Sequence, residues 1–195
     1  AQEAEKIFVR EFGGTLFTIA KDVKLQLEFN PHKVQSYRLV GYENRMLENE
    51  AFANDKKDAG DLGAGHTVTA LYELVPAGVD DIYAGKSEPL KYQQVTRDKF
   101  VTELATLKVR YKNPDALRSQ LLEYIIPSDE SEVSADGSFA SAVALFGMLL
   151  RHSEFLQSGD YAQVLSLAEP GLSNDPDGER AEFIQMVKIA RKLNR

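Results

Sequence analysis

The hydrophobic period of the chain changes at Pro127, and this change constrains the fold more than any other feature of the sequence. Before Pro127, apolar residues alternate with polar ones, which is typical of strands that bury one face of a sheet. In the clearest run, Val23, Leu25, Leu27 and Phe29 face one side, and the polar residues between them face the other. The first part of the chain is therefore predicted to be mainly β-structure.

Several further runs show the same alternation, and no helical pattern separates them. Because parallel strands need crossover helices, these runs predict an antiparallel β-sandwich over residues 15–127. Residues 48–65 and 76–100 are long, polar connections, and loops of this length are often functional or mobile. The loop length alone specifies no chemistry. The expected strands are Leu16–Ala20, Val23–Phe29, Val34–Tyr42, His66–Val75, Leu104–Lys112 and Leu121–Ile126.

After Pro127 the pattern becomes helical. Residues 128–136 form an acidic linker, and apolar positions then recur at helical spacing from Phe139 to about Ser153. A second helix is expected after Asp160 and a third over about 178–193. The expected N-caps are Asp136 or Ser138 for the first helix and Asp177 for the third. The fold class is therefore predicted as α+β, a mainly antiparallel β-sandwich followed by a C-terminal three-helix segment over residues 128–195.

Composition narrows the classes of function. The 195 residues are 43% hydrophobic and carry a net charge of −7, which argues against nucleic-acid binding driven by bulk charge. No apolar stretch approaches the roughly 20 residues of a membrane-spanning helix. The chain has no cysteine, so disulfides, thiolate metal sites and cysteine catalysis are excluded. No cofactor is predicted.

Candidate catalytic residues are few. Of the three histidines, only His66 has a suggestive setting, because it follows Gly63-Ala64-Gly65 at the start of an expected strand. These glycines precede a strand, whereas a dinucleotide-binding loop follows one, so a tight turn or bulge explains them better. The acidic residues of the nearby loop lack the spacing of a calcium loop. An enzyme or small-ligand site using His66 and residues 55–65 remains the alternative hypothesis.

Two polar clusters are candidate interaction or structural sites. Lys108, Arg110 and Lys112 occupy alternate positions of one expected strand and form a basic stripe on one face. The stripe would either meet an acidic partner or keep a sheet from pairing with other sheets, and the acidic net charge favours the second interpretation. The other cluster is polar, lies at a strand end and fits a hydrogen-bonded strut as well as a recognition site. It consists of Tyr42, Glu43, Asn44 and Arg45.

Six sequence blocks together resemble a known family. They lie in the expected order between residue 3 and about residue 190, and the chain is similar to the C-terminal region of bacterial YfbK-type von Willebrand factor type A domain proteins. The resemblance implies an A domain upstream of this region, with residues 1–14 as its last helix. The blocks are EAEKIFVREFGGTLFTIAKDVKLQLEFNP, YRLVGYENR, DAGDLGAGHTVTALYEL, ELATLKVRYK, FASAVALFGMLLR and RAEFIQMVKIA.

The resemblance also implies a role and a location. The family's metal motif, D-x-S-x-S, has no match here, so no metal ligand is assigned to any residue. Members of the family are expected to be exported, often as lipoproteins. We therefore expect a non-catalytic, extracytoplasmic module whose partners are its own upstream A domain and an unidentified protein. The helical tail would pack on the sandwich or on that A domain, and homotypic assembly through edge strands is a further alternative.

Overall fold

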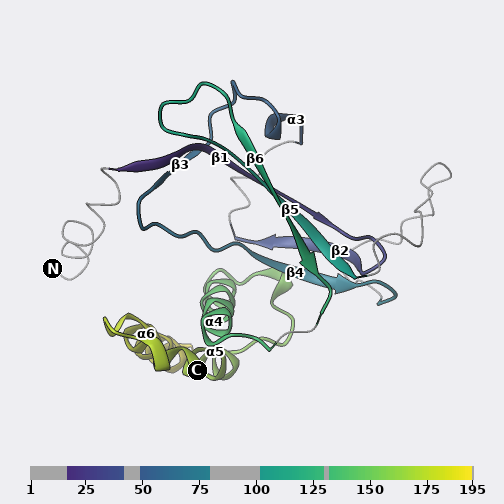
Figure 1. The fold of residues 1–195 in the computed structure, drawn as a ribbon. Coiled ribbons are helices and arrows are strands. Elements are labelled where there is room, and N and C mark those ends of the chain that lie inside the picture. The colour runs from purple at the N-terminus through teal and green to yellow at the C-terminus, as the bar shows by residue number, and fades with distance from the viewer. Residues whose placement is uncertain (1–16, 42–48, 80–101, 130–131, 195) are drawn as a thin grey trace. The chain divides into compact units, whose positions relative to one another are not determined.

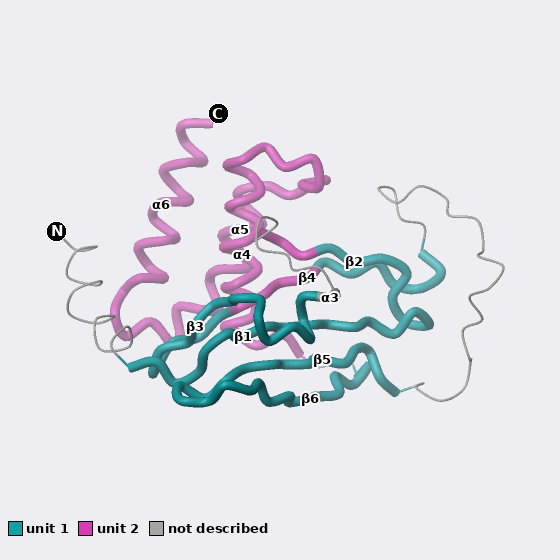
Figure 2. The backbone as a smooth tube through the Cα atoms, turned by 90° about the horizontal axis from the view of Figure 1, so that it is seen from above, with its two compact units in different colours: residues 1–38, 42–68, 73–129 teal, residues 39–41, 69–72, 130–195 magenta. Residues whose placement is uncertain are grey.

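The computed structural model describes residues 17–41, 49–79, 102–129 and 132–194. These residues form two compact units, which are described separately (Figure 2). The first unit comprises residues 1–38, 42–68 and 73–129, and the second comprises residues 39–41, 69–72 and 130–195. The described strands are β1 (Thr18–Phe29), β2 (Val34–Val40), β3 (Gly60–Gly63), β4 (Leu71–Pro76), β5 (Glu103–Lys112) and β6 (Gln120–Pro127). The described helices are α3 (Asn49–Phe52), α4 (Ala135–Leu150), α5 (Tyr161–Ala168) and α6 (Glu179–Leu193).

The strands form two antiparallel sheets (Figure 1). The larger sheet has the order β3-β1-β5-β6, and the smaller one pairs β2 with β4. Phe29 of β1 and Tyr37 of β2 join the two sheets, with ring centroids 4.5 Å apart. With three helices following the strands, the α+β prediction is confirmed, and the two sheets supply the two layers that a sandwich needs.

The alternation in β1 builds an apolar face across three strands. In the register of the larger sheet, Leu25 lies opposite Val109 of β5, which in turn lies opposite Leu122 of β6. A second row has the same composition, because Leu27 pairs with Leu107 and Leu107 pairs with Tyr124. Directly opposed residues in a sheet lie on the same face. The predicted grouping of apolar positions in β1 is therefore confirmed.

Two strand predictions differ from the structure. The runs Leu16–Ala20 and Val23–Phe29 are predicted as separate strands, but Thr18–Phe29 is one strand with a bulge at Asp22. The predicted strand from His66 begins instead at Leu71, because residues 66–70 are exposed and pair with none of the described strands. Their alternating pattern matches a strand, but a strand also needs a neighbouring ladder.

Asn30 and the ends of the smaller sheet fix the turn after β1. The Asn30 side chain accepts a hydrogen bond from the His32 backbone N–H at 3.0 Å and donates to the carbonyl of Glu103 at 2.8 Å. This arrangement is an Asx-type turn. In the smaller sheet, Arg38 of β2 forms an ion pair with Glu73 of β4.

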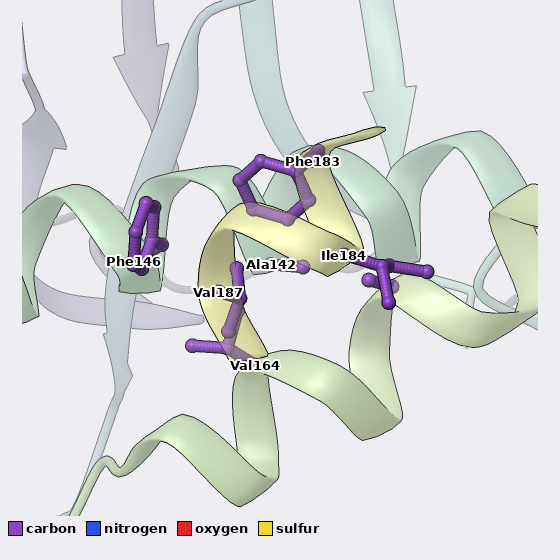
Figure 3. Packing of buried hydrophobic residues seen from close by; sticks show 7 residues of the cluster. Ala142, Phe146, Val164, Phe183, Ile184 and Val187 are labelled. Carbon is purple, nitrogen blue, oxygen red and sulfur yellow. The ribbon is translucent and has the colours of Figure 1, made fainter. Parts of the chain in front are cut away.

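The second unit has a core shared by α4, α5 and α6. Figure 3 shows that side chains from all three helices converge in it. Phe146 and Phe183 meet edge to face with ring centroids 5.5 Å apart, a geometry that aromatic pairs prefer. Val164 and Val187 are completely buried between them and the neighbouring turns. The buried cluster is Ala142, Phe146, Val164, Ala168, Phe183, Ile184 and Val187.

The helix caps correct two sequence predictions. The N-cap of α4 is Ser134, whose hydroxyl accepts from the Gly137 N–H at 3.0 Å, and not Asp136 or Ser138. The second helix begins after Asp160 as expected, and the Asp160 side chain caps it by accepting from the Gln163 N–H at 2.8 Å. The N-cap of α6 is Gly178 and not the predicted Asp177, and the Asp175 carboxylate accepts from the backbone N–H groups of Arg180 and Ala181. An Asp two residues earlier can reach these groups because Gly178 adopts a left-handed conformation, with φ of 74°.

Candidate functional site

The described part of the chain brings the predicted site residues together only in part. Tyr42, Glu43, Asn44 and Arg45 lie outside the described residues. His66 is exposed after β3, and its backbone N–H donates to the Gly63 carbonyl at 3.2 Å. No described contact joins His66 to the carboxylates of residues 55–61. The enzyme hypothesis based on His66 therefore stays a prediction.

The basic stripe of β5 lies on one face of the sheet. Lys108 faces Glu28 of β1, with 3.7 Å between its Nζ and the nearer carboxylate oxygen. Lys112 Nζ donates to Asp22 Oδ2 at 2.7 Å and to the Asp55 carbonyl at 2.8 Å. The Lys108–Glu28 ion pair is open to solvent and contributes little to stability. In the Lys112–Asp22 ion pair, by contrast, both side chains are largely buried.

A bulge in β1 directs Asp22 toward Lys112. Between Lys21 and Lys24, the register against β5 shifts by one residue, and Asp22 adopts a left-handed conformation with φ of 51°. Aspartate and asparagine tolerate this conformation better than most residues. The turned side chain accepts from Lys112 and, through Oδ1, from the Ala59 N–H at 3.1 Å. The bulge thus connects β1 to the chain that precedes β3.

Asp55 makes the second connection. Its Oδ1 accepts from the Ser119 hydroxyl at 2.5 Å, and Ser119 Oγ accepts from Arg110 Nη1 at 3.0 Å. The Arg110 guanidinium also lies over the ring of Phe52, 5.4 Å from its centroid, as in a cation–π contact. We call Asp22, Asp55, Arg110, Lys112 and Ser119 the polar clamp. It holds residues 52–61 against the sheet.

Hydrogen bonding shifts the proton affinities in the clamp. The hydrogen bond from Lys112 holds the pKa of the Asp22 carboxyl below its usual value, and the bond from Ser119 does the same for the pKa of Asp55. The bond to Asp22 raises the pKa of Lys112. Each group therefore favours its charged form, which suits a permanent structural contact better than proton transfer near neutral pH.

Lys24 lies beneath the segment that the clamp holds. It is only 2% exposed, and its Nζ donates to the Asn54 carbonyl at 2.6 Å. A buried ammonium needs such an acceptor, because removing it from water is costly. Arg110 Nε, by contrast, is buried without a hydrogen-bond partner among the described residues. The polar face of the sheet is thus covered by its own chain at this point.

Sequence reasoning missed Asp22, Lys24, Asp55 and Ser119 as members of one cluster. Their contacts join residues up to 90 positions apart, so no local spacing identifies them. The one local signal is Asp22, a residue type that accepts left-handed backbone, directly before the alternating run. In the described residues, no group of three or more His, Asp or Glu side chains is placed to hold a metal ion. None of the described helices has both the length and the apolar character needed to cross a membrane.

Comparison with known proteins assigns the chain to a family. The profile described as "Uncharacterized protein YfbK, C-terminal" matches residues 14–193. This chain belongs to the YfbK C-terminal family. The curated protein "Uncharacterized protein YfbK" of Escherichia coli (strain K12) is 41% identical over 192 residues. The family resemblance inferred from the sequence blocks is therefore confirmed.

The match covers most of this chain but only part of the E. coli YfbK protein. It covers 96% of this chain but 32% of the relative, so the chain spans about a third of the length of that YfbK protein. No solved structure matches the chain. The two sheets, the polar clamp and the three C-terminal helices thus describe the part of the YfbK family that corresponds to its C-terminal region.

Proposed function

We propose that this chain is a non-catalytic accessory module of a longer extracytoplasmic protein, in which it supports or positions an upstream von Willebrand factor A domain. The observation that carries the proposal is the polar clamp. Two of the three basic-stripe side chains that were candidates for an acidic partner, Arg110 and Lys112, are engaged within the chain. Their contacts hold residues 52–61 in place, which is a structural task.

The length of the E. coli relative supports the idea of a module. Two thirds of that protein lie outside the match, which leaves room for at least one further domain. The name of the family profile places the matched region at the C-terminal end. The A domain, export and a lipid anchor rest on the family resemblance and belong to the proposal.

Removal of the module from the full-length protein tests the proposal. We expect a version that ends at residue 14, so that it keeps the helix assigned to the A domain, to show a lower melting temperature of its upstream domain than the full-length protein shows. A matched control is full-length protein carrying Ser173→Ala, which removes only a local hydrogen bond to the Pro170 carbonyl. An unchanged melting temperature and unchanged ligand binding by the truncated protein would contradict a supporting or positioning role.

Homotypic assembly is a second candidate because of β6. Among the described strands, this eight-residue strand lies at the edge of the larger sheet, and both Leu121 and Ile125 are exposed on it. Exposed apolar edge strands can pair with another copy of the same chain. Light scattering across a wide concentration range tests this role, and a monomer at every concentration would exclude it.

A further inference from the structure

The two faces of the larger sheet differ in an unexpected way. On the polar face, Lys24 is 2% exposed, because the segment held by the clamp covers it. On the apolar face, Leu25, the next residue of the same strand, is 51% exposed. A sheet normally buries its apolar face and leaves the polar one in water. Here the sheet leaves part of its apolar face open.

The open area is defined by the strand register. We call the rows Leu25–Val109–Leu122 and Leu27–Leu107–Tyr124 the apolar face. The outer position on β6 is open in both rows, since Leu122 is 40% and Tyr124 53% exposed. The contact between Phe29 and Tyr37 lies beyond these rows, at the end of β1. Contiguous apolar surface of this kind, with an aromatic residue in it, marks interaction sites.

The apolar face contains no charged residue, which defines the chemistry of its occupant. The six side chains of the two rows are aliphatic except for Tyr124. A charged surface placed against them would lose its hydration without gaining an ionic partner. An aliphatic or aromatic surface with few charges would instead gain from burial at both sides of the contact.

The length of the related protein favours one occupant. In the E. coli relative, two thirds of the chain lie outside the matched region, and the profile describes that region as C-terminal. In that relative the upstream polypeptide is covalently joined to the matched region, so a corresponding upstream domain would meet β1, the first described strand and the one that carries Leu25, at a high effective concentration.

We propose that the upstream part of the same polypeptide packs an uncharged apolar surface against the apolar face of the larger sheet. This inference rests on the proposed function and names the surface by which the module would position its neighbour. The contact is formed through Leu25, Leu122 and Tyr124, whose exposed area it buries. The polar face of the same sheet, already covered near Lys24, takes no part in it.

Site-specific thiol labelling tests the contact, because the chain contains no cysteine. The probes are Leu25→Cys and Tyr124→Cys, measured in the isolated chain and in full-length protein whose own cysteines, if any, have been replaced. The matched controls are Glu28→Cys and Glu123→Cys, on the same two strands but on the opposite face. The Glu28 side chain is 73% exposed, and its ion pair is solvent-accessible, so its loss costs little.

We expect both probes to react at least about tenfold more slowly in the full-length protein than in the isolated chain, which corresponds to about 1.4 kcal/mol of protection. The control positions should react at the same rate in the full-length protein as in the isolated chain. Two probe positions keep the test valid if one variant does not fold, as judged by circular dichroism.

Four results would overturn the inference. Equal probe rates in both proteins would show that the upstream part does not cover the face. Protection that increases with the concentration of the isolated chain would assign the face to a second copy. Protection of the probes in the isolated chain at every concentration would show that the chain covers the face itself. Protection of the control positions to the same extent as the probes would show that the effect is not specific to this face.

The labelling result is independent of the truncation test of the proposed function. Protected probes together with an unchanged melting temperature of the truncated protein would sustain the contact and contradict the supporting role. Unprotected probes together with a lowered melting temperature would sustain the supporting role and assign it to another surface.

Discussion

Two glycine-to-alanine substitutions in the helical unit should change its stability in opposite directions. A Cβ at Gly171 would lie 2.9 Å from Cβ and Cδ2 of Phe139, whereas non-bonded carbon atoms prefer about 3.5–4.0 Å. The Phe139 ring has little freedom to move away. It packs against Phe183 with centroids 5.3 Å apart, and the Arg180 guanidinium lies 4.9 Å from its centroid.

The expected change in the free energy of unfolding follows from these contacts. Overpacking of a well-packed site costs about 1–3 kcal/mol, and the reduced freedom of the unfolded chain returns about 0.4–1 kcal/mol of this. We therefore expect Gly171→Ala to destabilise the helical unit by about 1–2 kcal/mol. Gly147 lies within α4 with nothing within 4 Å of its added Cβ. Gly147→Ala should therefore stabilise the unit by about 0.5–1 kcal/mol, because alanine is the better helix former.

Thermal and urea unfolding followed by far-UV circular dichroism measures both effects, since α4, α5 and α6 dominate the helical signal. For a unit of this size, 1 kcal/mol shifts the melting temperature by about 4–8 °C. The matched pair separates steric overlap from the general effect of replacing glycine. A Gly171→Ala protein as stable as the original, or a Gly147→Ala protein destabilised to the same extent, would refute the steric reasoning.

Three further predictions concern the polar clamp and the start of α6. Because Lys112 lowers the pKa of folded Asp22 below its ordinary 3.8, Asp22 stabilises the sheet unit above that pH, and this contribution is lost as the pH falls through the folded pKa. The difference in urea midpoint between the original chain and Asp22→Asn should therefore shrink in acid. Ser119→Ala should cost about 1–2 kcal/mol and speed amide exchange in residues 52–61, because it removes the donor to Asp55. Asp175→Ala should lower the helical signal and the melting temperature, since two backbone N–H groups of α6 lose their acceptor.

Control variants distinguish these effects from general damage. Asp115→Asn should leave the acid dependence unchanged, because Asp115 is exposed in the turn after β5. Ser173→Ala removes only a local bond to the Pro170 carbonyl and should leave exchange in residues 52–61 unaltered. A constant difference between the original chain and Asp22→Asn at all pH values would contradict the role of the Asp22 charge. Unchanged exchange in Ser119→Ala would contradict the clamp.

Sequence periodicity predicts which side chains share one face of a strand better than it predicts which segments cover that face. The alternation of Leu25 and Leu27 with polar residues correctly groups them on one face, because side chains alternate in any regular strand. Periodicity assigns Lys24 to the polar face, but its burial depends on the Asn54 carbonyl, which comes from a distant segment. Whether a face is buried is decided by tertiary contacts that no local pattern records.

Short elements were missed for the same reason. Residues 60–63, a glycine-rich and partly charged sequence, form β3 because they pair with β1, and nothing in their own alternation predicts this. Residues 66–70 show the opposite failure, since they alternate well but have no partner strand within the described part of the chain. The polar clamp adds Asp22 and Ser119 to the basic stripe that the sequence does predict, through contacts fixed only when the chain folds.

Because of the bulge at Asp22, the two halves of β1 should differ in how well they tolerate insertions and deletions. In a strand without such a residue, the insertion or deletion of one residue reverses the orientation of every later side chain. The left-handed residue absorbs one extra position, so the half that pairs with β3 can gain or lose residues during evolution while Leu25 and Leu27 keep their orientation. Between Lys24 and Phe29 the same freedom does not exist, and related chains should keep this distance constant.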